Sequence, residues 1–209
     1  MPGDSPELWP VHEVEQIWDG GAPFSVRRDL LTRPGADPDE GSFGRLVLEH
    51  PGAVVILAVD DQDRAFVLRQ YRHPVGQRLV ELPAGLLDVP GEDPLVAAKR
   101  ELREEALLEA GRWDRLFGTW SSPGLSSETI DYFLARDLTE APDRGDFEPA
   151  HEEADMTTAW VAVDDLLDAV RDGRICDGPT VSALLGYRWL VAGDGSPRHS
   201  GAAGAPEAR

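Results

Sequence analysis

The chain has 209 residues and a formal net charge of -19 at pH 7, and apolar residues make up 41% of it. This length and composition suit a folded chain with a hydrophobic core, built as one large domain or as a domain with a small appendage. The strong negative charge argues against nonspecific binding to nucleic acid or to an anionic membrane, because each phosphate contact requires a cation.

The N-terminal residues show little regular alternation of apolar and polar side chains. Residues 1–22 are polar with scattered tryptophans, and no element is predicted there. Alternating side chains predict short strands at 24–28 and 44–50, on either side of a Pro/Gly/Asp-rich turn at 34–42. We expect residues 1–50 to form a small β segment suited to dimerisation.

The next segment predicts a buried hairpin. Residues 53–59 are a continuous apolar run, which indicates a strand buried on both faces, and Asp60 to Asp63 then form a turn. Residues 65–72 are the expected partner strand. Another short strand at 79–82 ends at Pro83.

A helix is predicted after this hairpin, with Asp93 as its N-cap and Pro94 at its first position. Apolar residues then recur at helical spacing, at Leu95, Ala98, Leu102 and Ala106. Further predicted elements are strands at 115–120, 130–135 and 158–163, an acidic loop at 139–155, and helices at 164–171 and 180–191. We expect an α+β domain over residues 51–192 and a disordered Gly/Ala-rich tail over 193–209.

Three carboxylates stand out on the first predicted helix. Glu101, Glu104 and Glu105 occupy positions i, i+3 and i+4, so they share one side of the helix and repel one another. One interpretation is a solvated surface pattern balanced by the flanking cations Lys99, Arg100 and Arg103. The other is a site for a hard divalent metal, which prefers oxygen ligands. The spacing alone leaves both open.

The surroundings of these carboxylates resemble the Nudix box. Gly85 is followed seven residues later by Glu92, and Arg100 then opens the run R-E-L-R-E-E. The gap after Gly85 is one residue longer than in the usual box, and Leu107 stands where the box has a glycine. The resemblance implies that Mg²⁺ or Mn²⁺ is held by Glu101, Glu104, Glu105 and the carbonyl of Ala84, with Glu92 and Arg100 as a bracing ion pair.

Three further segments are similar to the ADP-ribose pyrophosphatase branch of this family, notably its actinobacterial members. They are residues 70–72 with 81–85, residues 122–128, and residues 151–156. The resemblance implies an α/β/α sandwich with a mixed central sheet, a homodimer, and metal-dependent cleavage of ADP-ribose to AMP and ribose 5-phosphate. Other nucleoside diphosphate derivatives, and a sensor that binds ADP-ribose without cleaving it, remain alternatives.

The same resemblance suggests how the substrate is held. It implies substrate contacts from Arg45, Arg69, Arg72, Glu81 and Gly124. A guanidinium can hold a phosphate through two parallel hydrogen bonds, although these arginines also fit ordinary surface cations. Gly124 permits close backbone approach, although its Ser-Pro-Gly context also fits a tight turn.

Catalysis also needs a base for the attacking water. The glutamates of the helix, including the catalytic Glu105, are expected to bind metal. We therefore expect the base to come from the acidic loop. Family position favours Glu153 over Glu152 for this role. A solvated acidic loop is the competing interpretation of both residues.

Cysteine content and hydropathy suggest a compartment. Cys176 is the single cysteine, so no intramolecular disulfide can form, and we assign it no chemistry. The N-terminus lacks a basic-then-apolar signal pattern, and no stretch approaches the ~18 apolar residues of a membrane span. We expect a cytoplasmic protein with a small-molecule substrate.

Overall fold

The computed structural model describes residues 3–20, 23–37, 41–145, 148 and 155–192. These residues divide into two compact units. The described residues of unit 1 fall within 1–51 and 122–129, and those of unit 2 within 52–121 and 130–192.

Unit 1 is a three-stranded antiparallel sheet in the order β1-β2-β3. Its strands are β1 (Val11–Asp19), β2 (Ser25–Leu31) and β3 (Phe43–Glu49). The strands expected from residues 24–28 and 44–50 are therefore confirmed. The register also places Arg45 directly opposite Asp29.

Strand β1 was not expected from the sequence, and its pairing with β2 explains why. The register shifts twice, between Val11 and Glu13 and between Gln16 and Trp18. Each irregularity inserts a residue into one strand and interrupts the two-residue alternation of side chains. The apolar positions therefore recur at Val11, Val14 and Ile17, which is not the pattern of a regular strand.

The connection between two strands of unit 2 also belongs to unit 1. Residues 122–129 lie along β3, where Leu48 and Ser126 form a parallel bridge. The N–H of Leu48 donates to the Leu125 carbonyl at 2.8 Å, and the N–H of Ser127 donates to the Leu48 carbonyl at 3.0 Å. This connection is therefore held by backbone hydrogen bonds to the end of β3.

Unit 2 contains a four-stranded sheet in the order β7-β4-β9-β8 and a three-stranded sheet in the order β10-β5-β6. Strands β4 and β9 are parallel, while β4 pairs with β7 in the antiparallel sense. The strands are β4 (Ala53–Ala58), β5 (Arg64–Arg72), β6 (Gln77–Glu81), β7 (Ala84–Leu86), β8 (Leu108–Trp120), β9 (Thr129–Glu140) and β10 (Thr157–Ala162).

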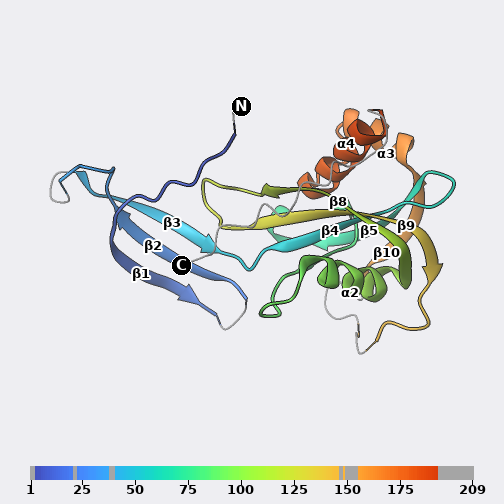
Figure 1. Ribbon diagram of the computed structural model, residues 1–209, viewed down its shortest axis with the longest axis horizontal. Coiled ribbons are helices and arrows are strands. Elements are labelled where there is room, and N and C mark those ends of the chain that lie inside the picture. The colour runs from blue at the N-terminus through green and yellow to red at the C-terminus, as the bar shows by residue number, and fades with distance from the viewer. Residues whose placement is uncertain (1–2, 21–22, 38–40, 146–147, 149–154, 193–209) are drawn as a thin grey trace. The chain divides into compact units, whose positions relative to one another are not determined.

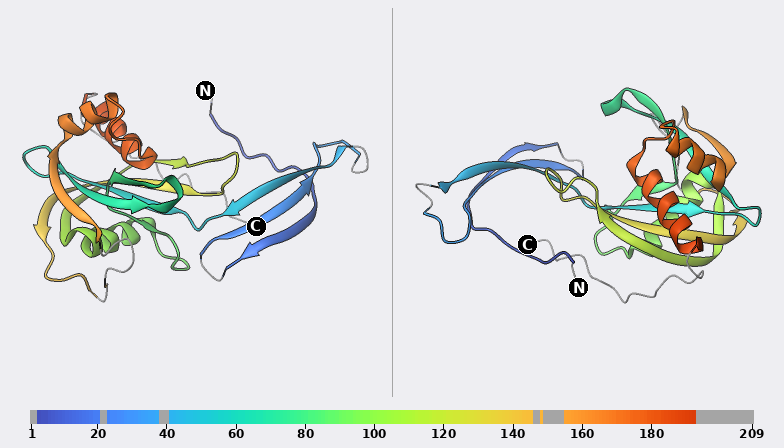
Figure 2. Two further views of the ribbon diagram at one scale, coloured as in Figure 1. Left: turned by 180° about the vertical axis from the view of Figure 1, so that it is seen from behind. Right: turned by 90° about the horizontal axis from the view of Figure 1, so that it is seen from above.

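Helices cover both faces of the four-stranded sheet. Helix α2 (Pro94–Ala106) lies on one face, and α3 (Val163–Arg171) and α4 (Gly178–Ala192) lie on the other (Figures 1 and 2). A short 3-10 helix, η1 (His73–Val75), joins β5 to β6. Across the part of the chain that the structure describes, no helix is long and apolar enough to cross a membrane.

Strand β4 is the centre of the hydrophobic core. Val54, Ile56 and Ala58 belong to the cluster that includes α2 side chains. The alternate residues Val55, Leu57 and Val59 belong to the cluster formed with α3 and α4. Because successive side chains of a strand point to opposite faces, the continuous apolar run 53–59 serves both layers. The expected α+β sandwich with a mixed sheet is confirmed.

The two ends of α2 show how the sequence sets its length. The Asp93 carboxylate accepts a hydrogen bond from the N–H of Leu95 at 2.8 Å, and Pro94 is the first helical residue, as predicted. At the other end Leu107 has φ 54° and ψ 38°, a left-handed conformation. The helix thus ends in the backbone geometry that favours glycine, although a leucine occupies the position.

We predict that Leu107→Gly stabilises the protein. A left-handed conformation costs a non-glycine residue about 1–2 kcal/mol, and the Leu107 side chain is partly exposed, so its loss removes few buried contacts. Urea denaturation is expected to show an unfolding free energy higher by about 0.5–1 kcal/mol.

The control is Leu125→Gly, at an exposed leucine without positive φ. This variant is expected to show no increase in unfolding free energy. Equal stability of the two variants would contradict the assignment of strain to Leu107.

Candidate metal site on helix α2

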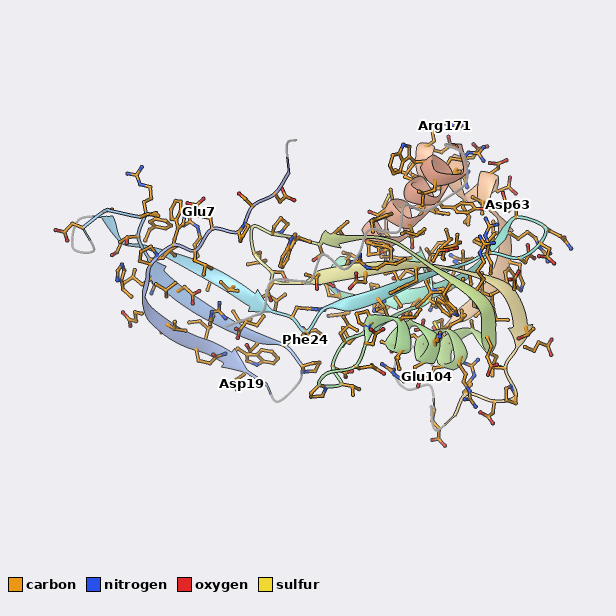
Figure 3. All side chains as sticks on the ribbon, viewed as in Figure 1. Glu7, Asp19, Phe24, Asp63, Glu104 and Arg171 are labelled. Carbon is orange, nitrogen blue, oxygen red and sulfur yellow. The ribbon has the colours of Figure 1, made fainter. Side chains whose placement is uncertain are left out.

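Helix α2 carries the three glutamates singled out in the sequence. The side chains of Glu101 and Glu105 are buried, at 9% and 7% exposure, and Glu104 is half-buried. Figure 3 labels Glu104 on this helix. A solvated ion-pair pattern would leave all three side chains in water, so burial of two of them disfavours that interpretation.

The backbone of β7 lies directly against two of these carboxylates. A Cβ atom added at Gly85 would overlap the carboxylate of Glu101. The N–H of the preceding residue, Ala84, donates to Oε2 of Glu105 at 2.9 Å. Strand β7 is held in turn by pairing with β4, where Val55 is opposite Ala84 and Val54 is opposite Gly85. Glycine is therefore required here for close approach of the helix side chain.

Arg100 joins the glutamates to the loop before the helix. Its Nη2 lies 3.2 Å from Oε2 of Glu92, so the expected ion pair is present. The same guanidinium also reaches two glutamates of α2, because its Nη1 lies 2.6 Å from Oε1 of Glu101 and 3.3 Å from Oε2 of Glu104. These last two contacts match the alternative in which a flanking cation balances the glutamates, and Glu104 is one helical turn after Arg100.

Electrostatics at this cluster follow from burial and from these contacts. Burial raises the pKa of Glu101 to about 7, with Arg100 opposing the shift and Glu104 adding to it. Burial lowers the pKa of Arg100, but its hydrogen bond to Glu92 and its attraction to Glu101 and Glu92 outweigh that effect and raise it. Glu101 is therefore a carboxylate whose charge needs a cation close by.

A second ion pair joins strands β5 and β6 of unit 2. Arg72 donates from Nε to Oε1 of Glu81 at 2.8 Å and from Nη2 to Oε2 at 2.7 Å. The bond to Glu81 raises the pKa of Arg72, and attraction to Glu105 and Asp177 raises it further. Two residues expected at the substrate are thus bound to each other, close to a glutamate of α2.

The donor set fits a hard divalent cation. Buried carboxylate oxygens are the ligands that Mg²⁺ and Mn²⁺ accept, and an uncompensated buried carboxylate is costly. Within the described residues, however, no group of three or more histidine, cysteine, aspartate and glutamate side chains is gathered closely enough to hold a metal. Glu101 and Glu104 instead contact Arg100, and Glu105 contacts the backbone of Ala84.

The remaining expected site residues fall in three places. Arg69 is exposed on β5 of unit 2. Arg45 and Gly124 belong to unit 1, where Arg45 lies over the Phe43 ring at 4.5 Å. Glu152 and Glu153 lie outside the described residues. The substrate contacts expected of Arg45, Arg69 and Gly124, and the role of general base expected of Glu153 or Glu152, stay predictions.

The contact between β7 and α2 leads to a prediction. Gly85→Ala places a methyl group where the Glu101 carboxylate lies, so the unfolding free energy should fall by about 1–3 kcal/mol in urea denaturation. Gly178→Ala is the control, because a Cβ at Gly178 meets no atom within 4 Å. Equal stability of both variants and the unsubstituted protein would show that Glu101 does not need this space.

Comparison with known proteins identifies the family of this chain. The model of the NUDIX domain matches residues 49–182. The chain is 42% identical over 178 residues to an ADP-ribose pyrophosphatase of Mycobacterium tuberculosis (strain ATCC 25618 / H37Rv), covering 85% of this chain and 83% of the relative. It is 32% identical over 172 residues to a methanol dehydrogenase activator of Bacillus methanolicus, covering 82% and 88%.

A solved structure extends the likeness to the fold. The crystal structure of an ADP compounds hydrolase superposes with a TM-score of 0.73 at 23% sequence identity, covering 93% of this chain and 100% of that chain. The matched model includes β7, α2 and the glutamates described above. From the match over residues 49–182 and the relatives at 42% and 32% identity, we conclude that this chain belongs to the Nudix family.

Proposed function

We propose that this protein is a Mg²⁺- or Mn²⁺-dependent pyrophosphatase that hydrolyses ADP-ribose to AMP and ribose 5-phosphate. The observation that carries the proposal is the packing of Glu101 and Glu105 of α2 against the backbone of Gly85 and Ala84. This packing presents buried hard oxygen donors on one side of a helix. The name of the relative at 42% identity supports ADP-ribose as the substrate.

Each residue has a distinct role in the proposed mechanism. Glu101, Glu104, Glu105 and the Ala84 carbonyl would hold the metal, which when bound would neutralise the pyrophosphate and acidify a water molecule. Glu153 accepts the proton of the attacking water, with Glu152 as the alternative. Arg69 or Arg72 takes up charge on the phosphate oxygens.

The pairing of Arg72 with Glu81 refines its part in this mechanism. Two parallel bonds to Glu81 fix the plane of the guanidinium, which removes much of the freedom of a long side chain. A guanidinium held in this way reaches an incoming phosphate with little loss of entropy. We propose that Glu81 acts on the substrate through Arg72.

We predict that the purified protein converts ADP-ribose to AMP and ribose 5-phosphate when Mg²⁺ is present, and that Glu105→Gln lowers kcat by a factor on the order of 10² or more. Chromatography of the products is the measurement. Glu109→Gln, at an exposed glutamate on β8, is the matched control and should retain activity.

A substrate panel of NADH, other sugar nucleotides and diadenosine polyphosphates tests the alternative substrates. Unchanged ADP-ribose beside turnover of another nucleotide would replace the assigned substrate. Tight binding of ADP-ribose without product would favour a sensor.

We also propose that unit 1 forms a homodimer interface. Among its described residues, the buried side chains belong only to Asp29 and Thr32, so the unit has no hydrophobic core of its own. A three-stranded sheet needs an apolar face covered by another layer. Its large exposed apolar side chains are Leu8, Trp9, Val11, Val14, Ile17, Trp18, Leu46 and Leu125.

Val14→Lys should weaken this dimer, because it places a charge among the exposed apolar side chains of β1. Size-exclusion chromatography with light scattering is expected to show a shift from dimer to monomer. Val96→Lys, at a similarly exposed valine on α2, is the control. An unsubstituted protein of monomeric mass would refute the proposed dimer.

We place this activity in the cytoplasm and assign it a small-molecule substrate. The single cysteine fits a reducing compartment, and a net charge of -19 disfavours nucleic acid and anionic membranes as partners. An acidic protein can still bind an anionic pyrophosphate when metal lies between them.

A further inference from the structure

We propose that Arg100 is a place-holder cation for the metal site. In this proposal, a divalent metal binds by taking Glu101 and Glu104 from the guanidinium, while Glu92 keeps Arg100 beside the site. The proposal rests on the proposed function, because it requires that the α2 glutamates bind metal. It adds that an arginine of this chain competes with the metal and so sets its affinity.

The two ends of the guanidinium have different partners. Nε and Nη2 face Glu92, at 3.4 Å from Oε1 and 3.2 Å from Oε2. Nη1 faces the helix and is shared by Glu101 at 2.6 Å and Glu104 at 3.3 Å. The contacts on Nη1 can therefore be given up while the two contacts to Glu92 remain.

Burial explains why the glutamates need a cation before metal arrives. Glu101 is 9% exposed and lies against Gly85, so water does not compensate its charge well. Glu104, one turn away along the helix, adds repulsion. Arg100 is the cation that the structure places in contact with both carboxylates.

The same contact opposes metal binding. Carboxylate oxygens that bond a guanidinium must be released before a divalent cation uses them, and a neighbouring positive charge repels that cation. If Arg100 instead prepared the carboxylates for metal, its removal would weaken metal binding. The two models thus predict opposite signs for one measurement.

Arg103 provides a matched control on the same helix. Its Nε donates to the backbone carbonyl of Asp143 at 3.1 Å, and its Nη2 pairs with the Asp143 carboxylate. It contributes a positive charge to α2, as Arg100 does. Replacing Arg103 therefore removes a positive charge from α2 without removing a contact to Glu101 or Glu104.

The experiment is a titration of the metal-stripped full-length protein with Mn²⁺, with free Mn²⁺ measured by electron paramagnetic resonance. Arg100→Gln is expected to lower the dissociation constant about three- to tenfold, the effect of one nearby unit charge. Glu92→Gln is expected to raise it by a similar factor, because the guanidinium then has no competing partner outside the helix. Arg103→Gln should stay within about twofold.

A thermal measurement supplies an independent readout. Without metal, Arg100→Gln should melt at a lower temperature than the unsubstituted protein, and saturating Mn²⁺ should narrow that difference. Arg100→Lys keeps the charge but lacks the planar fork that spans both partners. Because that charge still repels the metal, Arg100→Lys should lower the Mn²⁺ dissociation constant by less than Arg100→Gln does. If Arg100→Gln does not fold, Arg100→Met, which also removes the charge, takes its place with the same direction expected.

The outcomes separate this inference from the proposed function. Weaker or unchanged Mn²⁺ binding by Arg100→Gln, with tight binding by the unsubstituted protein, overturns the place-holder role and leaves the metal site standing. Equal tightening by Arg100→Gln and Arg103→Gln also overturns it, because general charge would explain both. Absence of Mn²⁺ binding by the unsubstituted protein overturns both proposals together.

Discussion

The contact between the backbone of β7 and the carboxylates of α2 is the interaction on which the site depends. Glu101 fits only because Gly85 has no side chain, and Glu105 is oriented by the N–H of Ala84. Both contacts bring charged oxygens into a region largely withdrawn from water. Such oxygens need a cation, and the geometry thereby favours a hard metal over a solvated surface role.

The rest of unit 2 keeps these two elements in register. Strand β4 pairs with β7 and packs its even-numbered side chains in the cluster that includes α2, so one buried strand positions both sides of the site. Its odd-numbered side chains pack in the cluster that includes α3 and α4. A displacement of β4 would therefore move the carboxylates relative to the backbone that orients them, which ties the stability of the core to the geometry of the site.

Patterns over a few neighbouring residues allowed the main elements of unit 2 to be predicted. Asp93 and Pro94 located the start of α2, and the apolar run 53–59 located the central strand, because capping and hydrophobic burial act over a few residues. Strand β1 escaped prediction because two irregularities in its register interrupt the alternation. The pair of Arg72 and Glu81 also escaped, since it depends on how β5 and β6 align across a hairpin.

The residue order alone determined which carboxylates share a face of α2 and that a glycine precedes them, since both follow from helical periodicity and from identity at a position. It did not determine the partners of those carboxylates. Whether Glu101 meets solvent, metal or Arg100 depends on burial and on side-chain reach in three dimensions. Likewise the sequence shows that Leu107 replaces the expected glycine, but only the structure shows its left-handed backbone. Hydrogen bonds from the Leu107 N–H to the Arg103 carbonyl and from the Ala141 N–H to the Leu107 carbonyl accompany that conformation, whose local cost the whole fold offsets.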